Sequence, residues 1–291
     1  MCDEQTIKES DEYLREQGIT RRDFGKGTAG LALTMLLPSV ANALDVVESD
    51  VFVPTPDGEA DCYFVHPSAG AHAAVIIWPD IVGIRAAFRG MGKRLAEAGY
   101  SVLVVNPYYR TVKGNAVPEG SRFRDEGIRD QLMPHARSLS PETCVTDGKA
   151  FVEWLDAQES VDTNRMIGTT GYCMTGSYTF RLAAAIADRI GAGASFHGGG
   201  LATDRDDSPH KLVPDIKAGM LVAIAENDDQ RDPAAKDKLR AAFDASGGQA
   251  EIEVYEGALH GWCPPDSAVY NEVQAERAWS RLMALFEREL A

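Results

Sequence analysis

Several features that would decide the class of this 291-residue chain are scarce in it. Five cysteines are too few and too scattered for a disulfide framework, and no Cys-x-x-Cys or His-x-x-x-His spacing indicates a metal site. Lysine and arginine number 29 against 44 aspartates and glutamates, so the formal net charge is −15. A chain this acidic lacks the basic surface that nucleic acid requires. We therefore expect no metal, no cofactor and no nucleic-acid partner.

Long apolar runs are also lacking, since the run at 27–37 is too short to span a bilayer. It follows the basic pair Arg21-Arg22 and precedes the small-x-small sequence at 41–43. A charged region, a short apolar region and such a cleavage site are typical of a secretory signal peptide. The arginine pair resembles a twin-arginine export signal, which is read by a receptor and is not an anchor.

We therefore expect residues 1–43 to be a twin-arginine signal peptide whose first 19 residues are polar and irregular. The alternative is a helix that contains an arginine pair by chance. The signal predicts an interaction with the twin-arginine export machinery, no stable membrane anchor, and a periplasmic or secreted protein. Residues 44–291 are long enough for one large α/β domain, and they contain no second core, linker or internal repeat.

Apolar runs alternate with helical patterns along the rest of the chain. Continuous runs of this kind are typical of strands buried on both faces of a sheet. The predicted strands cover residues 74–78, 100–105, 166–170, 192–197, 220–225 and 252–255, and residues 50–66 form a hairpin around a turn at 55–58. The predicted helices cover 85–98, 141–157, 178–190, 233–245 and 267–289, and the polar segment 110–140 crosses over the sheet.

This alternation implies βαβ units. It predicts an α/β protein with a mostly parallel central sheet and helices on both faces. In such sheets, ligands bind at the carboxyl ends of the strands, so the residues that follow the predicted strands are the candidates for a functional site.

A candidate nucleophile lies where a predicted strand meets a predicted helix. The sequence Gly-Tyr-Cys-Met-Thr-Gly occupies residues 171–176. It is similar to the Gly-x-Ser-x-Gly elbow, in which small neighbours let the turn tighten and expose the reactive side chain. The helix N-terminus there favours a thiolate and a developing oxyanion. Cys173 is therefore a candidate nucleophile, although such a cysteine can also be a small hydrophobe packed in a tight turn.

A thiol nucleophile needs a base, and the base needs an acid to orient it. Asp228 follows the strand at 220–225, and His260 follows the strand at 252–255. The chain order is then nucleophile, acid, histidine, which is the order of the α/β-hydrolase fold. Among the six histidines only His197 and His260 closely follow predicted strands, and His260 is favoured because it comes after the acid.

Two further assignments follow from the same geometry. The acid could also be Asp229, Glu226 or Asp232, and Asp228 is preferred because its spacing would first aim a side chain at the neighbouring loop. The oxyanion hole should use the backbone N–H that follows the nucleophile, which belongs to Met174. Its second donor should come from the loop after the strand at 74–78, where Ile81 is the expected residue.

At these positions the chain resembles the dienelactone hydrolase family of α/β hydrolases, over roughly residues 50–290. The matching pieces are Ile167-Gly168, Gly171-Tyr172-Cys173, Ala225-Glu226-Asn227-Asp228, Tyr255-Glu256-Gly257, His260-Gly261 and Pro107-Tyr108-Tyr109-Arg110. The resemblance implies hydrolysis of a lactone or ester through an acyl-cysteine, with Cys173, Asp228 and His260 as the triad.

The chain departs from the family's type member in two places. Asp80 stands where the resemblance implies a Glu that helps to activate the thiol, and Pro264 stands where it implies an Arg that binds the substrate carboxylate. A second substrate-binding arginine of the family would correspond to Arg122, Arg124 or Arg129. A neutral ester or lactone is therefore as plausible a substrate as dienelactone, in a pocket lined by Tyr172, His197, Trp262 and Arg122. Alternatives are a thioesterase, a peptidase, or an exported protein that binds a ligand without turnover.

Overall fold

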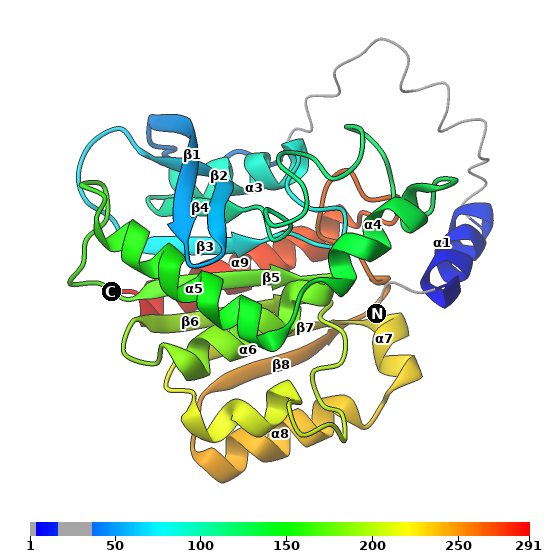
Figure 1. Cartoon of the computed structure of the whole chain (residues 1–291). Coiled ribbons are helices and arrows are strands. Elements are labelled where there is room, and N and C mark those ends of the chain that lie inside the picture. The colour runs from blue at the N-terminus through cyan, green and yellow to red at the C-terminus, as the bar shows by residue number, and fades with distance from the viewer. Residues whose placement is uncertain (1–3, 17–36) are drawn as a thin grey trace.

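The computed structural model describes residues 4–16 and 37–291. The arginine pair and most of the apolar run of the expected signal therefore lie outside the described residues. An eight-stranded sheet in the order β1-β2-β4-β3-β5-β6-β7-β8 forms the centre of the domain (Figure 1). The first two strands form an antiparallel hairpin at one edge, β2 pairs antiparallel with β4, and the remaining pairs are parallel. This arrangement confirms the predicted α/β fold.

The strands are β1 (Val46–Thr55), β2 (Gly58–Pro67), β3 (Ala74–Trp78), β4 (Ser101–Val105), β5 (Ile167–Tyr172), β6 (Ile190–Phe196), β7 (Gly219–Ala225) and β8 (Ala250–Tyr255). The helices are α1 (Glu4–Glu16), α3 (Ala86–Glu97), α4 (Ile128–Arg137), α5 (Pro141–Asp156), α6 (Gly176–Ala185), α7 (Glu226–Arg231), α8 (Ala235–Ser246) and α9 (Glu272–Glu289), with 3₁₀ turns η1 (Cys173–Thr175) and η2 (Pro209–Asp215).

Two layers of helices cover the sheet (Figure 1). Apolar side chains of α5, α6 and α8 pack on one face around Phe151, Phe180 and Phe243. Those of α3 and α9 pack on the other face, where Phe88 and Phe286 are fully buried. The central strands β3 to β6 are buried along their whole length, which explains why their sequences are continuously apolar or small.

The structure corrects four of the predicted elements. The helix expected over 178–190 ends at Ala185, because Ile190 already pairs with Ile167 as the first residue of β6. The segment 110–140 contains helix α4, whose Leu132 is fully buried. The last helix begins at Glu272 rather than 267, because the Asn271 side chain accepts a hydrogen bond from the Gln274 N–H and caps the helix there.

The fourth correction concerns the N-terminus. Residues 4–16 were expected to be irregular, but they form helix α1. Its apolar Leu14 is 5% exposed, so the helix packs against the rest of the chain rather than standing in solvent. Among the residues that the structure describes, no helix is both long and apolar enough to cross a membrane.

Candidate active site

Cys173 lies at the tight turn between β5 and α6, as the sequence predicts. Its backbone φ is 58°, in the left-handed region that non-glycine residues rarely adopt. The backbone and side chains packed around this turn leave no room for a Cβ at Gly171 or Gly176. A Cβ on Gly171 would lie 2.2 Å from the Thr175 carbonyl oxygen, and one on Gly176 would lie 2.5 Å from the Ser195 Oγ. The two glycines therefore allow the strained turn that carries the thiol.

Replacing Gly171 by alanine is expected to cost at least about 4 kcal/mol of unfolding free energy, since the new methyl group meets backbone that cannot move aside. The matched control is Gly90→Ala in the interior of α3, where the nearest atom to a new Cβ is a leucine methyl at 3.8 Å. That change should raise stability by up to about 1 kcal/mol. Urea unfolding of both variants measures the difference, and equal midpoints would contradict the proposed role of Gly171.

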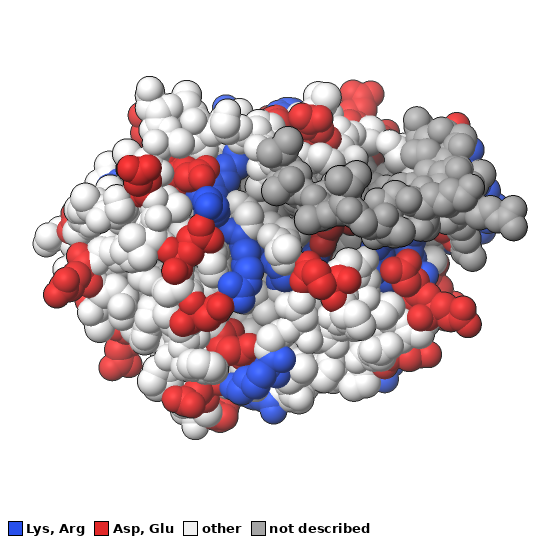
Figure 2. Space-filling view, turned by 90° about the horizontal axis from the view of Figure 1, so that it is seen from above, with Lys and Arg blue, Asp and Glu red and all other residues white. Residues whose placement is uncertain are grey.

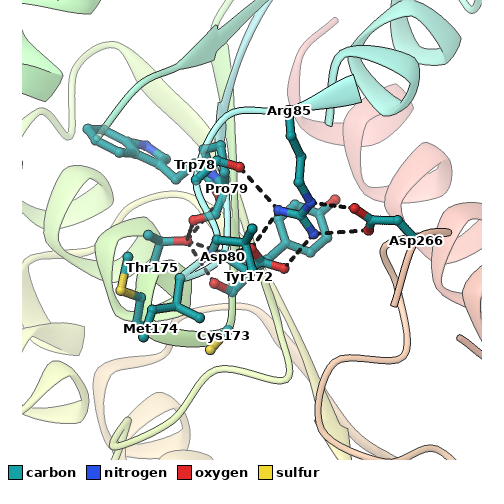
Figure 3. A network of polar contacts seen from close by, with 12 residues as sticks. Trp78, Pro79, Asp80, Arg85, Tyr172, Cys173, Met174, Thr175 and Asp266 are labelled. Carbon is teal, nitrogen blue, oxygen red and sulfur yellow. Dashed lines mark hydrogen bonds and ion pairs between the residues drawn. The ribbon is translucent and has the colours of Figure 1, made fainter. Parts of the chain in front are cut away.

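Thr175 ties the turn to the neighbouring strand (Figure 3). Its buried hydroxyl accepts a hydrogen bond from the Tyr172 N–H at 2.9 Å, and it lies 2.9 Å from the Trp78 carbonyl and 3.0 Å from the Pro79 carbonyl. The end of β3 is thereby fixed against the thiol-bearing turn. The sequence pattern identified Thr175 only as a small residue, because a contact across 97 positions leaves no local signal.

The structure brings Cys173, His260 and Asp228 together. The His260 Nε2 lies 3.2 Å from the Cys173 Sγ, and the His260 Nδ1 lies 2.6 Å from the Asp228 Oδ2. Both Cys173 and His260 are buried, at 2% and 4% exposure. One imidazole therefore contacts the thiol with one nitrogen and the carboxylate with the other, which is the arrangement that thiol activation requires.

The charges around His260 favour its protonated form. Burial by itself lowers the pKa of this histidine, but the facing Cys173 thiolate and the Asp228 carboxylate outweigh it and raise the pKa to about 10. His260 therefore holds a proton more readily when the facing thiol is deprotonated. A thiolate–imidazolium pair holds both the nucleophile and a proton ready for a leaving group.

Two other carboxylates that were candidates for the acid, Asp229 and Glu226, have other partners. Asp229 forms an ion pair with Lys236 at 2.6 Å, and Glu226 accepts a hydrogen bond from the Gly257 N–H at 2.7 Å. Asn227 has a role that the sequence did not predict, because its Oδ1 accepts the His260 backbone N–H at 2.8 Å. The short helix α7 thus presents the acid to the imidazole and holds the backbone of the histidine loop.

Asp80 lies in the same pocket but is held by an arginine (Figure 3). Arg85 donates to its two carboxylate oxygens at 2.7 and 3.0 Å, and the Val82 N–H donates to it at 2.9 Å. The same guanidinium also binds Asp266, and Arg85 is only 6% exposed. Burial holds the pKa of Asp80 above its usual range despite Arg85. Asp80 is therefore bound to Arg85, and a contact between Asp80 and the Cys173 thiol would compete with this ion pair.

Removing Arg85 should destabilise the protein strongly. Arg85→Met leaves two largely buried carboxylates, whose side chains are 13% and 14% exposed, without their guanidinium, and breaking a buried pair costs about 3–5 kcal/mol. The loss should shrink at acidic pH, where Asp80, whose pKa is raised by burial, becomes protonated and neutral. The control is Arg205→Met, which breaks an exposed pair with Asp207 and should leave the unfolding midpoint unchanged. An Arg85→Met protein as stable as the wild type would contradict this role.

The pocket above Cys173 contains some of the expected residues and excludes others. Asp80, Ile81, His197 and Arg122 line it together with Cys173 and His260. The expected pocket residues Tyr172 and Trp262 do not line it. Tyr172 stacks on Phe196 with ring centroids 5.0 Å apart, and Trp262 stacks on Tyr255 at 5.3 Å, both inside the apolar core. Their large apolar rings are more stable in that core than beside polar groups.

His197 packs against the imidazole of His260. Its ring lies edge-on to His260 with centroids 5.1 Å apart, and it is 1% exposed. Among the described residues, neither of its ring nitrogens has a hydrogen-bond partner. Burial and the charge of His260 lower the pKa of His197 well below its usual value. A neutral ring with two buried nitrogens, unpaired within the described part of the chain, thus lies directly beside the His260 imidazole.

The two expected oxyanion donors belong to segments that meet at the thiol. Met174 follows Cys173 within η1, and Ile81 lies in the loop after β3. The Ile81 carbonyl accepts a hydrogen bond from the Tyr108 hydroxyl at 2.8 Å, and that hydroxyl also contacts the Met174 sulfur at 3.7 Å. Tyr108 thereby fixes both segments. Their use as an oxyanion hole remains a proposal.

The charges of the described surface are mixed. Figure 2 shows acidic and basic side chains interspersed on the face seen from above. Within residues 4–16 and 37–291, no three His, Cys, Asp or Glu side chains lie close enough together to hold a metal ion. The four cysteines in these ranges are all free thiols.

The chain is similar to known proteins in sequence and in fold. Residues 60–290 match the family described as "Dienelactone hydrolase family". Carboxymethylenebutenolidase of Rhodococcus opacus is 25% identical over 234 residues, which cover 78% of this chain and 86% of the relative. A dienelactone hydrolase homologue of Klebsiella pneumoniae superposes with a TM-score of 0.71 at 21% identity, over 84% of this chain and 99% of that chain.

A second solved structure has the same fold. It is the dienelactone hydrolase-like promiscuous phosphotriesterase P91 from metagenomic libraries, with a TM-score of 0.69 at 16% identity over 84% of this chain and 99% of that chain. The family match extends over well more than half of the sequence and includes all the site residues described above. The chain therefore belongs to the dienelactone hydrolase family and is a hydrolase of that family.

Proposed function

We propose that this protein hydrolyses a carboxylic ester or lactone through an acyl-cysteine, with Cys173 as nucleophile, His260 as acid and base, and Asp228 as the group that orients His260. The observation that carries the proposal is the line of contacts from the Cys173 sulfur to the Nε2 of His260 at 3.2 Å and from its Nδ1 to Asp228 at 2.6 Å. Thiol, imidazole and carboxylate in hydrogen-bond reach form the minimal machinery for acyl transfer.

The reaction has two halves. The thiolate attacks the carbonyl carbon and forms a C–S bond, while the electron pair of the C=O bond moves to oxygen, where the N–H groups of Met174 and Ile81 stabilise it. The electron pair returns, the ester C–O bond breaks, and His260 gives its proton to the leaving oxygen. Water, deprotonated by His260, then attacks the thioester, and the thiolate leaves with the carboxylic acid as product.

The substrate class follows from the pocket. A thiolate is a better leaving group than an ordinary alkoxide, so acylation favours aryl esters and enol lactones, whose oxygen leaves readily. Pro264 stands where an arginine is expected to bind a substrate carboxylate, and Arg85 already binds two carboxylates. Apolar Ile81, Val82 and Phe123 line the pocket together with Arg122 and Arg124, and Arg124 is bound to Asp11. We propose a neutral activated ester or enol lactone, because Pro264 replaces the expected carboxylate-binding arginine and apolar side chains form part of the lining.

We also propose export through the twin-arginine pathway, with removal of residues 1–43. Cleavage after Ala43 would leave a single α/β-hydrolase domain of residues 44–291 that keeps the whole sheet, since β1 begins at Val46. Residues 41–45 are exposed, as a processing site must be. The support is the order of arginine pair, apolar run and small residues.

A substrate panel tests the proposed activity. 4-Nitrophenyl acetate, an enol lactone, an acyl thioester and a peptide anilide should be compared at equal concentration. We expect turnover of the activated ester and the enol lactone, with much slower hydrolysis of the anilide. Preferred cleavage of the thioester or the anilide would favour a thioesterase or peptidase instead, and no turnover of any of the four would contradict the proposal.

A further inference from the structure

Helix α1 contributes to the wall of the candidate active-site pocket. Its residues Thr6, Ile7 and Ser10 line the same pocket as Cys173 and His260. In Figure 1 it is the blue helix beside α4 and α7. A helix within residues 1–43, the expected export signal, thus forms part of the wall of the pocket in which the chemistry is proposed.

Charge pairs hold the helix there. The carboxylate of Glu9 accepts hydrogen bonds from the Arg231 guanidinium and, at 2.5 Å, from the Asn227 Nδ2. Asp11 accepts one from the Arg124 Nη1 at 3.1 Å. Burial raises the pKa of Glu9, but the hydrogen bonds from Arg231 and Asn227 hold it below its usual value. The carboxylate therefore stays charged at neutral pH, and acidic side chains of α1 meet basic side chains at the pocket rim.

The same contacts reach the proposed triad. Asn227 donates to Glu9 with its amide nitrogen and accepts the His260 backbone N–H with its amide oxygen. Arg231, which binds Glu9, also lies 3.7 Å from the Asp228 carboxylate. Glu9 also accepts a hydrogen bond from Gln5 of its own helix, and both of its partners outside α1 contact a proposed catalytic residue. The helix therefore lines the pocket and also contacts residues that hold the proposed triad.

We propose that α1 is an intramolecular inhibitor, which closes the mouth of the pocket in the full chain and opens it when the helix leaves. The inference rests on the proposed function of the pocket. The helix is held by its buried Leu14 and by two partly exposed ion pairs, and such pairs are individually weak. Covalent attachment compensates, because a tethered segment has a local concentration in the millimolar range. Cleavage at the exposed residues 41–43 would remove the tether and release the helix.

The decisive experiment measures access to the Cys173 thiol in the full chain. A maleimide that carries a polyethylene glycol chain is the probe, and alkylation of the Cys173 peptide is followed by mass spectrometry. In the variant Glu9→Lys/Asp11→Lys the helix is repelled by Arg231 and Arg124. We expect alkylation at least about tenfold faster than in the wild type, since two ion pairs are lost and replaced by repulsion.

The matched control is Glu12→Lys/Glu16→Lys, which makes the same charge change at two exposed positions of the same helix. Its alkylation rate should stay within about twofold of the wild type, because surface charges away from a contact contribute little. Added salt should speed the reaction of the wild type towards that of the Glu9/Asp11 variant, since salt screens the pairs. Equal rates for wild type and Glu9/Asp11 variant, at low and at high salt, would overturn the proposal.

The outcome is separable from that of the proposed function. Alkylation does not require turnover, so the helix can be shown to cover Cys173 even if no ester is hydrolysed. Conversely, the Glu9/Asp11 variant could hydrolyse esters and react with the maleimide at the wild-type rates. That result would support the proposed function and contradict the inhibitory role of α1. Thermal unfolding of both variants at the wild-type temperature would show that faster alkylation reports opening of the pocket and not unfolding.

Discussion

Cys173→Ala is expected to lower kcat/KM for 4-nitrophenyl acetate by at least about a thousandfold, because the variant has no group that can form the acyl intermediate. The fold should persist. The thiol is small and buried, and alanine fills most of its space at the turn. Steady-state hydrolysis measured alongside the unfolding midpoint separates loss of the nucleophile from loss of structure.

The matched control is Cys62→Ala, which removes an equally buried thiol from β2, in the sheet core. That variant should retain activity within a few-fold, since Cys62 contacts neither the pocket nor the imidazole. Retained activity in Cys173→Ala, or an equal loss in both variants, would contradict the assignment of Cys173 as nucleophile.

Asp228→Asn is expected to lower kcat by about a hundredfold to ten-thousandfold, as removal of the orienting carboxylate does in other triads. It should also change the pH profile. Together with the thiolate, the Asp228 carboxylate raises the pKa of His260 to about 10. Loss of this negative charge lowers that pKa, so the fall of activity on the alkaline side should begin at a lower pH than in the wild type.

Asp229→Asn is the control for this prediction. Its carboxylate is one residue away in the same helix but pairs with Lys236 instead of the imidazole. The variant should keep the wild-type alkaline limb and most of the activity. A shift of the limb in Asp229→Asn, or an unshifted limb in Asp228→Asn, would show that another group orients His260.

The fold was predictable from the sequence because its central strands are buried on both faces. The continuous apolar run at 74–78 coincides with β3, and the run at 220–225 lies within β7. Helix ends were less predictable. The alanine-rich run after Cys173 has helical propensity beyond Ala185, but pairing of Ile190 with Ile167 draws the chain into β6.

The candidate site was predictable where chain order carries information. Cys173, Asp228 and His260 each follow a strand of one parallel sheet, so topology alone brings them to the same edge. Contacts made by single residues from distant segments leave no such pattern. The pair of Arg85 with Asp266 spans 181 positions and that of Arg231 with Glu9 spans 222. For the same reason, the sequence did not show that Tyr172 and Trp262 belong to the core.

The most direct measurement of the proposed chemistry is mass spectrometry of the protein quenched in acid during hydrolysis of 4-nitrophenyl acetate. Acid preserves a thioester, so the covalent intermediate can be located by peptide mapping. We expect one added acetyl group on the peptide that contains Cys173, absent from Cys173→Ala and lost with time once substrate is exhausted. Turnover with no acetyl group on Cys173 under any quench time, or an acetyl group on another residue that appears and disappears at the turnover rate, would contradict an acyl-cysteine mechanism.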